Sequence, residues 1–146
     1  STFEEAVKIP FIISSPNHIK NKTTASFTEL VDVYPTLCNI ANIEAPSYLQ
    51  GESLIPVLEN PSTILKTEVY TRYKQGEAVI DKDFSYTEFY EGEKYLGNML
   101  YDNLNDNKQN TDISKLSSNK SVVKKYKEKL KVMREKVNKD PFHGHK

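Results

Sequence analysis

Apolar and polar residues alternate along the chain from Thr67 to Tyr90. A period of two residues is typical of β-strands with one buried face. Turn sequences at 75–76, 81–83 and 91–93 divide this region, so the pattern predicts three strands in a meander, with a fourth strand at Asn98–Tyr101. The two faces of the longest predicted strand would carry Phe84, Tyr86, Glu88 and Tyr90 on one side and Ser85, Thr87 and Phe89 on the other.

The end of the chain predicts an amphipathic helix that stops before Pro141. Its apolar residues recur at helical spacing, with lysines on the remaining positions, and are Val122, Tyr126, Leu130, Met133 and Val137. Ser121 is a suitable N-cap residue for this helix. We expect the helix to lie across one face of the predicted strands.

A second, shorter helix is predicted within residues 28–58. Its apolar face would carry Leu30, Val31, Val33, Leu37, Ile40 and Ala41. The helix should begin between Asp32 and Pro35, with the Asp32 side chain accepting hydrogen bonds from the free amides of the first turn. Asn42 would end it in a left-handed conformation. It is then two to three turns long, or about 10–16 Å.

The opening apolar run predicts a strand that is buried on both faces. Pro10 cannot donate to a neighbouring strand, so the paired part should be Phe11–Ser14, and Pro16 should end it. Such a strand needs neighbours in a sheet. Residues 17–26 are polar and rich in turn formers, which predicts an exposed loop, and a junction between subdomains is expected near residues 62–66.

Four segments of the chain carry motifs of a known family, and they are FEEAVKIPFIISSP, DVYPTLCNIA followed by GESLIPVL, FSYTEFYEGE, and MLYDNLNDNKQNTDIS. In this order they resemble the C-terminal part of type I sulfatases, in the alkaline-phosphatase-like α/β superfamily. The pair DVYPTLC and GESLIPVLENP most resembles iduronate-2-sulfatase-like members. The resemblance implies that residues 1–65 are the C-terminal part, at an edge, of the catalytic α/β domain. Residues 66–146 would be a small antiparallel-sheet subdomain with a packed C-terminal helix.

The resemblance also implies a parent protein that hydrolyses sulfuric esters, most naturally of sulfated carbohydrate. Family chemistry uses a formylglycine made in a CxPSR-like motif, a divalent metal, usually calcium, and Lys and His groups at the leaving oxygen. None of these motifs occurs in the 146 residues, so the sequence assigns the chain no catalytic and no metal-binding residue. We expect the N-terminal catalytic part of the same sulfatase to supply them, and the chain alone to be inactive. The family further implies a periplasmic, secreted or lysosomal location.

Arg72, Tyr73 and Lys74 are the candidate substrate contacts. They form a local pair of cations beside an aromatic residue at a strand end, and the planar fork of an arginine suits a sulfate or carboxylate group. In the sulfatases that the chain resembles, this subdomain helps to shape the rim of the substrate pocket. The alternative is a plain surface hairpin.

Composition narrows the remaining possibilities. Twenty basic and twenty acidic residues give a formal charge of zero, which does not favour nucleic-acid binding, and the longest apolar run is too short to span a membrane. The single cysteine, Cys38, lies on the apolar side of the predicted helix, which favours a buried inert thiol.

Three further patterns favour ordinary surface structure over a specific site. The pair His143 and His145 is expected in a solvated tail, and DNLNDNKQNTD departs from the EF-hand pattern and predicts turns. The lysines from 124 to 131 predict the wet face of the terminal helix, with a polyanion-binding patch as the alternative. The rival hypothesis for the whole chain is a freestanding, non-catalytic α+β interaction module.

Overall fold

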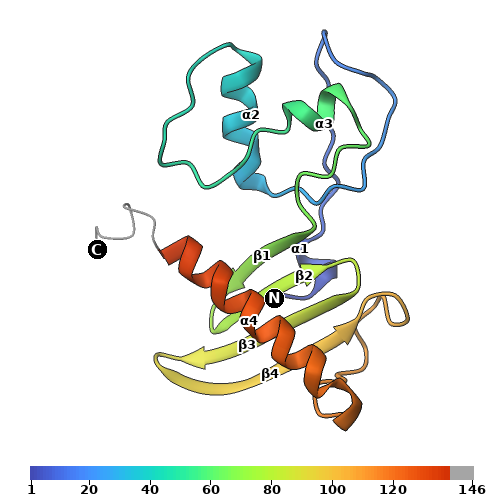
Figure 1. The fold of residues 1–146 in the computed structure, drawn as a ribbon, viewed down its shortest axis with the longest axis vertical. Helices are drawn as coiled ribbons and strands as arrows, with labels where there is room; N and C mark the ends of the chain where they lie inside the picture. The colour runs from blue at the N-terminus through green and yellow to red at the C-terminus, as the bar shows by residue number, and fades with distance from the viewer. Residues whose placement is uncertain (139–146) are drawn as a thin grey trace. The chain divides into compact units, whose positions relative to one another are not determined.

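The computed structural model of the chain describes residues 1–138, and these fall into two compact units. The first combines Ser1–Pro10 with Glu68–Lys136, and the second is built on Phe11–Thr67. In chain order, the elements are α1 (Glu4–Val7), η1 (Leu30–Asp32), α2 (Val33–Ile40), α3 (Ile55–Glu59), β1 (Glu68–Tyr73), β2 (Gly76–Asp81), β3 (Phe84–Glu91), β4 (Lys94–Asp102), η2 (Ser117–Asn119) and α4 (Lys120–Asn138) (Figure 1). The assignment of residues 1–65 to part of a larger catalytic domain stays a prediction.

The first unit contains an antiparallel sheet whose four strands are neighbours in chain order, β1-β2-β3-β4. This confirms the predicted meander. Val79 lies opposite Tyr86, and Tyr86 lies opposite Leu100, so one sheet face presents a row of large apolar side chains. β4 begins at Lys94, earlier than predicted, because the turn before it is tight. Gly92 takes a positive φ of 61° in that turn, a conformation that glycine adopts without steric cost.

Helix α4 packs across this apolar row, as predicted (Figure 1). Tyr126 and Leu130 from the helix join Val79, Tyr86 and Leu100 from the sheet in one buried cluster. Leu130 is 0% exposed, and full burial of a leucine side chain contributes roughly 1.5–3 kcal/mol. Val122 and Met133 are partly buried against the same cluster, whereas Val137 lies beyond Lys136 and outside this unit.

The N-terminal segment contacts the other face of the sheet. The Thr2 hydroxyl lies 3.3 Å from the hydroxyl of Thr87 on β3, and the Phe3 ring centre lies 5.6 Å from that of Tyr101 on β4. The Glu4 amide donates to the side-chain oxygen of Gln109 at 2.9 Å. The opening residues therefore belong to the sheet unit, where they cover part of the sheet face opposite α4.

In the second unit, the short predicted helix is present as α2, and Asn42 ends it with a φ of 55°. The prediction that Asp32 caps the first turn of α2 was wrong. Its carboxylate accepts the backbone N–H groups of Glu29 at 2.8 Å and Glu52 at 2.9 Å instead. The physical reason is a distant partner, because the Lys66 ammonium donates to both Asp32 oxygens, at 2.7 and 2.9 Å.

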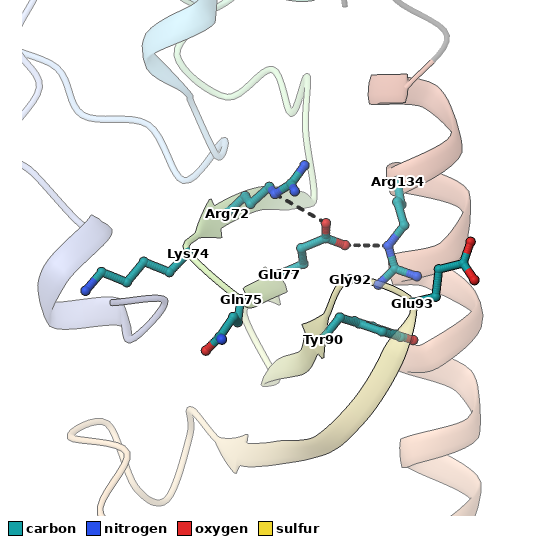
Figure 2. Close-up of a pocket in the computed structure, with 8 residues that line it drawn as sticks. All are labelled: Arg72, Lys74, Gln75, Glu77, Tyr90, Gly92, Glu93 and Arg134. Carbon is teal, nitrogen blue, oxygen red and sulfur yellow. Dashed lines mark hydrogen bonds and ion pairs between the residues drawn. The ribbon is translucent and has the colours of Figure 1, made fainter.

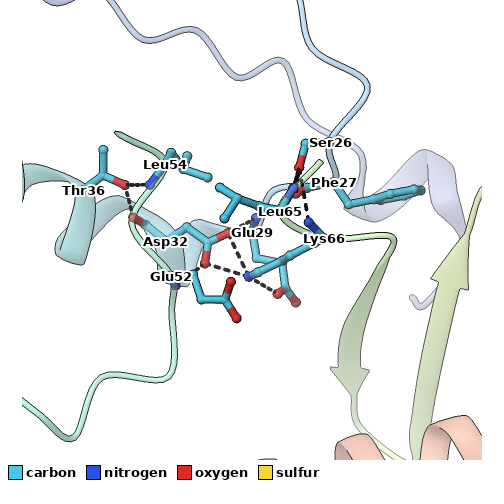
Figure 3. A network of polar contacts seen from close by, with 9 residues as sticks. All are labelled: Ser26, Phe27, Glu29, Asp32, Thr36, Glu52, Leu54, Leu65 and Lys66. Carbon is cyan, nitrogen blue, oxygen red and sulfur yellow. Dashed lines mark hydrogen bonds and ion pairs between the residues drawn. The ribbon is translucent and has the colours of Figure 1, made fainter. Parts of the chain in front are cut away.

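The contacts between Asp32 and Lys66 organise this unit (Figure 3). Asp32 is 0% exposed, and Lys66 also donates to a Glu29 oxygen at 2.7 Å. Burial lowers the pKa of Lys66, but its hydrogen bonds to Asp32 and Glu29 outweigh that effect, so the net pKa is raised. The Ser26 hydroxyl accepts the Leu65 amide at 3.0 Å. The segment that leads into the sheet is thereby joined to the start of α2.

Gly51 lies in this unit at a close backbone approach. A Cβ atom added there would be 2.0 Å from the carbonyl oxygen of Val31. The glycine of the GESL motif is therefore required by contact distance, because any side chain would collide with the Val31 backbone unless that backbone shifted.

The strand predicted at Phe11–Ser14 is not formed, and no strand occurs within Phe11–Thr67. A strand needs a partner for its backbone groups, and every strand of the described residues pairs within the β1–β4 sheet. Ile12 is 90% exposed. The apolar face predicted for α2 is helical but open to solvent, since Leu30 is 68% exposed and Leu37 is 55% exposed. These side chains are of the types found in a protein core, but the described residues leave them exposed.

Candidate functional site

A pocket of about 440 Å³ opens at the end of the sheet that carries the turn between β1 and β2 and the turn between β3 and β4, and α4 contributes Arg134 to its lining (Figure 2). Its lining is polar and comprises Arg72, Lys74, Gln75, Glu77, Tyr90, Gly92, Glu93 and Arg134. Residues from three parts of the sequence are brought together there, because in an antiparallel meander every second turn lies at the same end of the sheet.

Glu77 is at the centre of the charged groups in the pocket. Its Oε2 accepts a short hydrogen bond from Arg134 Nε, and its Oε1 lies 3.5 Å from Arg72 Nε. Only two of the 20 basic residues in the chain are arginines, and both contact this carboxylate. The arrangement fixes Arg134 firmly, whereas the Arg72 side chain remains 58% exposed.

A second carboxylate, Glu88, supports Arg134 from within the core. Arg134 Nη2 donates to Glu88 at 3.2 Å, and the hydroxyls of Tyr86 and Tyr90 donate to the same carboxylate at 3.0 and 2.9 Å. Burial lowers the pKa of Arg134, but hydrogen bonds to Glu77 and Glu88 outweigh it and raise the pKa. Burial, followed by the nearby Glu88 charge, raises the pKa of Tyr86 and holds this phenol neutral.

The structure separates the three predicted rim residues. Arg72 and Lys74 line the pocket, but Tyr73 does not, since neighbouring side chains of a strand point to opposite faces. Lys74 has a φ of 53° in the turn, and its ammonium lies 5.5 Å from the centre of the Tyr73 ring. Arg72 thus points its exposed cation into the pocket, whereas the side chain of Lys74, in the turn that lines the pocket, is directed away from Glu77 and Arg134 toward the Tyr73 ring (Figure 2).

Sequence reasoning did not find Arg134 or Glu77. Both side chains acquire their role from partners far away in the chain, which periodicity does not reveal. One signal was available: Arg134 is the single arginine in a helix whose other basic residues are lysines. An arginine forms planar paired hydrogen bonds that a lysine does not.

A second charged cluster attaches α4 to the sheet. Asp81 accepts the Tyr126 hydroxyl at 2.6 Å and the Lys129 ammonium at 2.9 Å, and Lys129 also bonds Glu68. The assignment of Lys129 to the wet face of the helix was therefore wrong, because its long side chain reaches two strand carboxylates. Burial raises the pKa of Asp81, but hydrogen bonds from Tyr126, Lys129 and the backbone outweigh it, and the net pKa lies below the usual value of 3.8.

The metal-ligating and nucleophilic side chains of the described residues are scattered rather than clustered. Within residues 1–138 no cluster of His, Cys, Asp and Glu side chains could hold a metal ion, and none of the helices there is long and apolar enough to cross a membrane. Cys38 is buried on α2, as predicted, and His18 contacts the Ser15 hydroxyl at 2.9 Å. The pair His143 and His145 lies outside the described residues. The side chains of residues 1–138 therefore do not fit a calcium centre, and the sequence has no formylglycine motif.

The asparagine-rich segment after β4 is a series of turns, as predicted. Asp102 accepts the backbone amides of Leu104 and Asn105, both at 3.0 Å, and Asp106 accepts that of Thr111 at 2.7 Å. Both carboxylates are thus already hydrogen-bonded to backbone amides of their own loop.

Residues 1–136 match the C-terminal family of N-sulphoglucosamine sulphohydrolase. The chain belongs to this sulfatase C-terminal family. Among curated proteins, it is 36% identical over 101 residues to the N-acetylglucosamine-6-O-sulfatase of Bacteroides thetaiotaomicron, an alignment that covers 60% of the chain and 18% of that protein. It is 39% identical over 62 residues to the mouse (Mus musculus) arylsulfatase K, covering 42% of the chain and 11% of that protein.

The fold of the family is also found among solved structures. A protein solved in complex with its substrate D-glucosamine-2-N,6-O-disulfate matches with a TM-score of 0.66 and 24% identity, over 78% of this chain and 25% of that one. The chain thus shares the fold of this solved structure, and the family match assigns the small four-stranded sheet and its C-terminal helix to the C-terminal part of a sulfatase. The chain spans about a fifth or less of the curated relatives described above.

Proposed function

We propose that the chain is the C-terminal part of a sulfatase that hydrolyses sulfuric esters of sulfated carbohydrate. The observation that carries this proposal is the family match over residues 1–136, together with relatives that are themselves sulfatases. The same observation disfavours a freestanding interaction module, because the match covers both units of the chain.

The chemical step would be supplied by the N-terminal catalytic part of the same sulfatase. In this family a formylglycine and calcium provide the nucleophile and the Lewis acid. The described residues of this chain hold neither group, so its own contribution would be to bind and orient the substrate. The finer assignment to iduronate-2-sulfatase-like enzymes is supported by DVYPTLC and GESLIPVLENP and is part of this proposal.

The contribution of the pocket would come from Arg72 and Lys74. Both are exposed cations, and the fork of Arg72 remains largely in solvent beside Glu77. A sulfate or carboxylate of the substrate could accept paired hydrogen bonds from Arg72. The Lys74 ammonium lies beside the Tyr73 ring in this structure, and its flexible stem would have to turn toward the pocket to add a point-charge contact.

The exposed face of α2 would contact the N-terminal catalytic part. Leu30, Tyr34, Leu37 and Ile43 are each more than half exposed, although their types belong in a core. Leu30, Tyr34 and Leu37 follow one another at helical spacing and so share one face, and a clustered exposed apolar surface marks an interface. Leu37→Asp should then disrupt assembly of the complete enzyme, whereas Glu44→Gln on the loop after α2 should not.

The substrate-binding role can be tested in the complete sulfatase that carries this chain. Arg72→Gln and Lys74→Gln should each raise KM for a sulfated disaccharide about tenfold, with kcat within about twofold, because binding contacts of this kind act on substrate affinity. Lys82→Gln is the matched control, since Lys82 is also an exposed cation in a turn, the one between β2 and β3 at the other end of the sheet. Equal KM values for the three variants would refute the role of the pocket.

A further inference from the structure

We infer that an exposed row of lysines on α4 is a binding track for a sulfated polysaccharide chain, a ligand class that rests on the proposed function. The row consists of Lys120, Lys124, Lys127 and Lys131. Their spacing of four, three and four residues places them on one face of the helix. At 1.5 Å per residue the row is about 16 Å long.

The basic charge of the chain is concentrated at this helix. Residues 120–136 contain eight basic and two acidic residues, whereas the rest of the chain contains 12 basic and 18 acidic residues. Within residues 1–138, Lys120, Lys124 and Lys131 form no ion pair. Lys129, on the opposite flank, is bonded to Glu68 and Asp81. Like charges on one helix face repel one another, and a bound polyanion would remove that repulsion.

Aromatic contacts connect the lysine row with the pocket. The Lys127 ammonium lies 5.6 Å from the ring centre of Tyr95, an exposed residue of β4. Tyr95 packs edge-on against Tyr90 at 5.5 Å, and the Arg134 guanidinium lies 4.9 Å from the Tyr90 ring. Tyr90 and Arg134 both line the pocket. The lysine row therefore leads along α4 to the site proposed for the substrate.

The type of charge also fits an extended polyanion. Lysine is a compact charge on a flexible stem, which suits a chain of anionic groups without a fixed geometry. The pocket, by contrast, offers the planar fork of Arg72, which suits a single group. Because the formal charge of the chain is zero, attraction would act locally, within the screening length of about 8–10 Å at moderate salt.

Two charge-matched double variants of the full chain test the track. The first variant, Lys124→Gln with Lys131→Gln, removes half of the row. The second, Lys125→Gln with Lys136→Gln, removes two exposed lysines that lie outside the row, beyond Glu128 and Glu135 around the helix. Affinity for a heparin oligosaccharide is measured by calorimetry at several salt concentrations, after circular dichroism shows equal folding. The first variant should bind about tenfold more weakly, and the slope of log Kd against log salt should be smaller by roughly two. The second should stay within about twofold of the native chain.

Equal weakening by both variants would overturn the track, because it would show a nonspecific charge effect. Equally tight binding of a single-stranded oligonucleotide, with the same dependence on the row, would overturn the assignment to sulfated polysaccharide. Fully desulfated heparin should bind at least about tenfold more weakly than heparin. These measurements involve no turnover, so loss of the track leaves the proposed sulfatase function standing, and loss of activity leaves the binding result unchanged.

Discussion

Arg72 on β1 and Arg134 on α4 share one carboxylate: Arg72 Nε lies 3.5 Å from Glu77 Oε1, and Arg134 Nε bonds Glu77 Oε2 (Figure 2). The two residues are 62 positions apart in the sequence. Their shared partner couples the helix to the strand that carries the exposed cation of the pocket.

Glu77→Gln is expected to destabilise the sheet unit by about 2–4 kcal/mol. Removal of one partner from a buried ion pair costs about 3–5 kcal/mol, and the partial exposure of Arg134 reduces that figure. Urea unfolding followed by circular dichroism measures the change. Glu93→Gln is the matched control, because Glu93 lines the same pocket but is exposed, and it should change stability by less than about 0.5 kcal/mol. Equal effects would show that Glu77 has no special role.

Leu130→Ala should cost roughly 2–5 kcal/mol, because the side chain is fully buried between α4 and the sheet. Lys131→Ala, one position further on the exposed face, should remain within about 0.5 kcal/mol. Lys129→Ala is not a neutral control, since Lys129 bonds Glu68 and Asp81. The urea midpoints of the two variants should differ clearly, and similar small shifts would contradict the packing of α4 on the sheet.

The sheet could be predicted from sequence because alternation is a local signal. Phe84, Tyr86 and Glu88 are alternate residues of β3, and all three lie on the sheet face that packs against α4, as a period of two residues requires. The helix α4 was predictable for the same reason, with a period of 3.6 residues. Neither pattern depends on partners elsewhere in the chain.

The predictions that were wrong depended on distant partners. Asp32 was expected to cap α2, but Lys66 draws its carboxylate away from the helix. The segment Phe11–Ser14 has the composition of a buried strand, but within residues 1–138 no neighbouring strand pairs with it. Arg134 was not singled out because Glu77 and Glu88 lie far from it in sequence. Local periodicity does not contain these long-range contacts.

Gly51→Ala should disrupt the second unit. The new Cβ atom would lie 2.0 Å from the Val31 carbonyl oxygen, so the backbone on one side must move. Hydrogen exchange at the amides of α2 should become at least about tenfold faster. Glu52→Ala, an adjacent exposed position that already has a Cβ atom, should leave exchange unchanged. Unchanged exchange in Gly51→Ala would contradict the close approach.

The stability of the sheet unit should decrease in acid through Asp81. The pKa of this carboxyl is lower in the folded state than its usual value of 3.8. Its contribution is therefore fully present above about pH 4 and is lost as pH falls through the folded pKa. In urea unfolding, the native chain should be more stable than Asp81→Asn at pH 7, and the difference should shrink by pH 3. Asp83→Asn, which changes a more exposed carboxyl, should show a small difference at both pH values. If the stability difference between the native chain and Asp81→Asn were the same at pH 7 and pH 3, it would contradict the proposed charge contacts.

The central claim is tested most directly by measuring sulfate release by three proteins. These are the complete sulfatase that carries this chain, the same enzyme without the 146 residues, and the 146 residues alone. The substrates are an aryl sulfate and a sulfated disaccharide. Turnover is expected for the complete enzyme only, because the 146 residues contain no CxPSR-like motif for a formylglycine and the remainder would lack the pocket lined by Arg72 and Lys74. Turnover by the 146 residues alone, or full activity of the enzyme without them, would contradict the central claim.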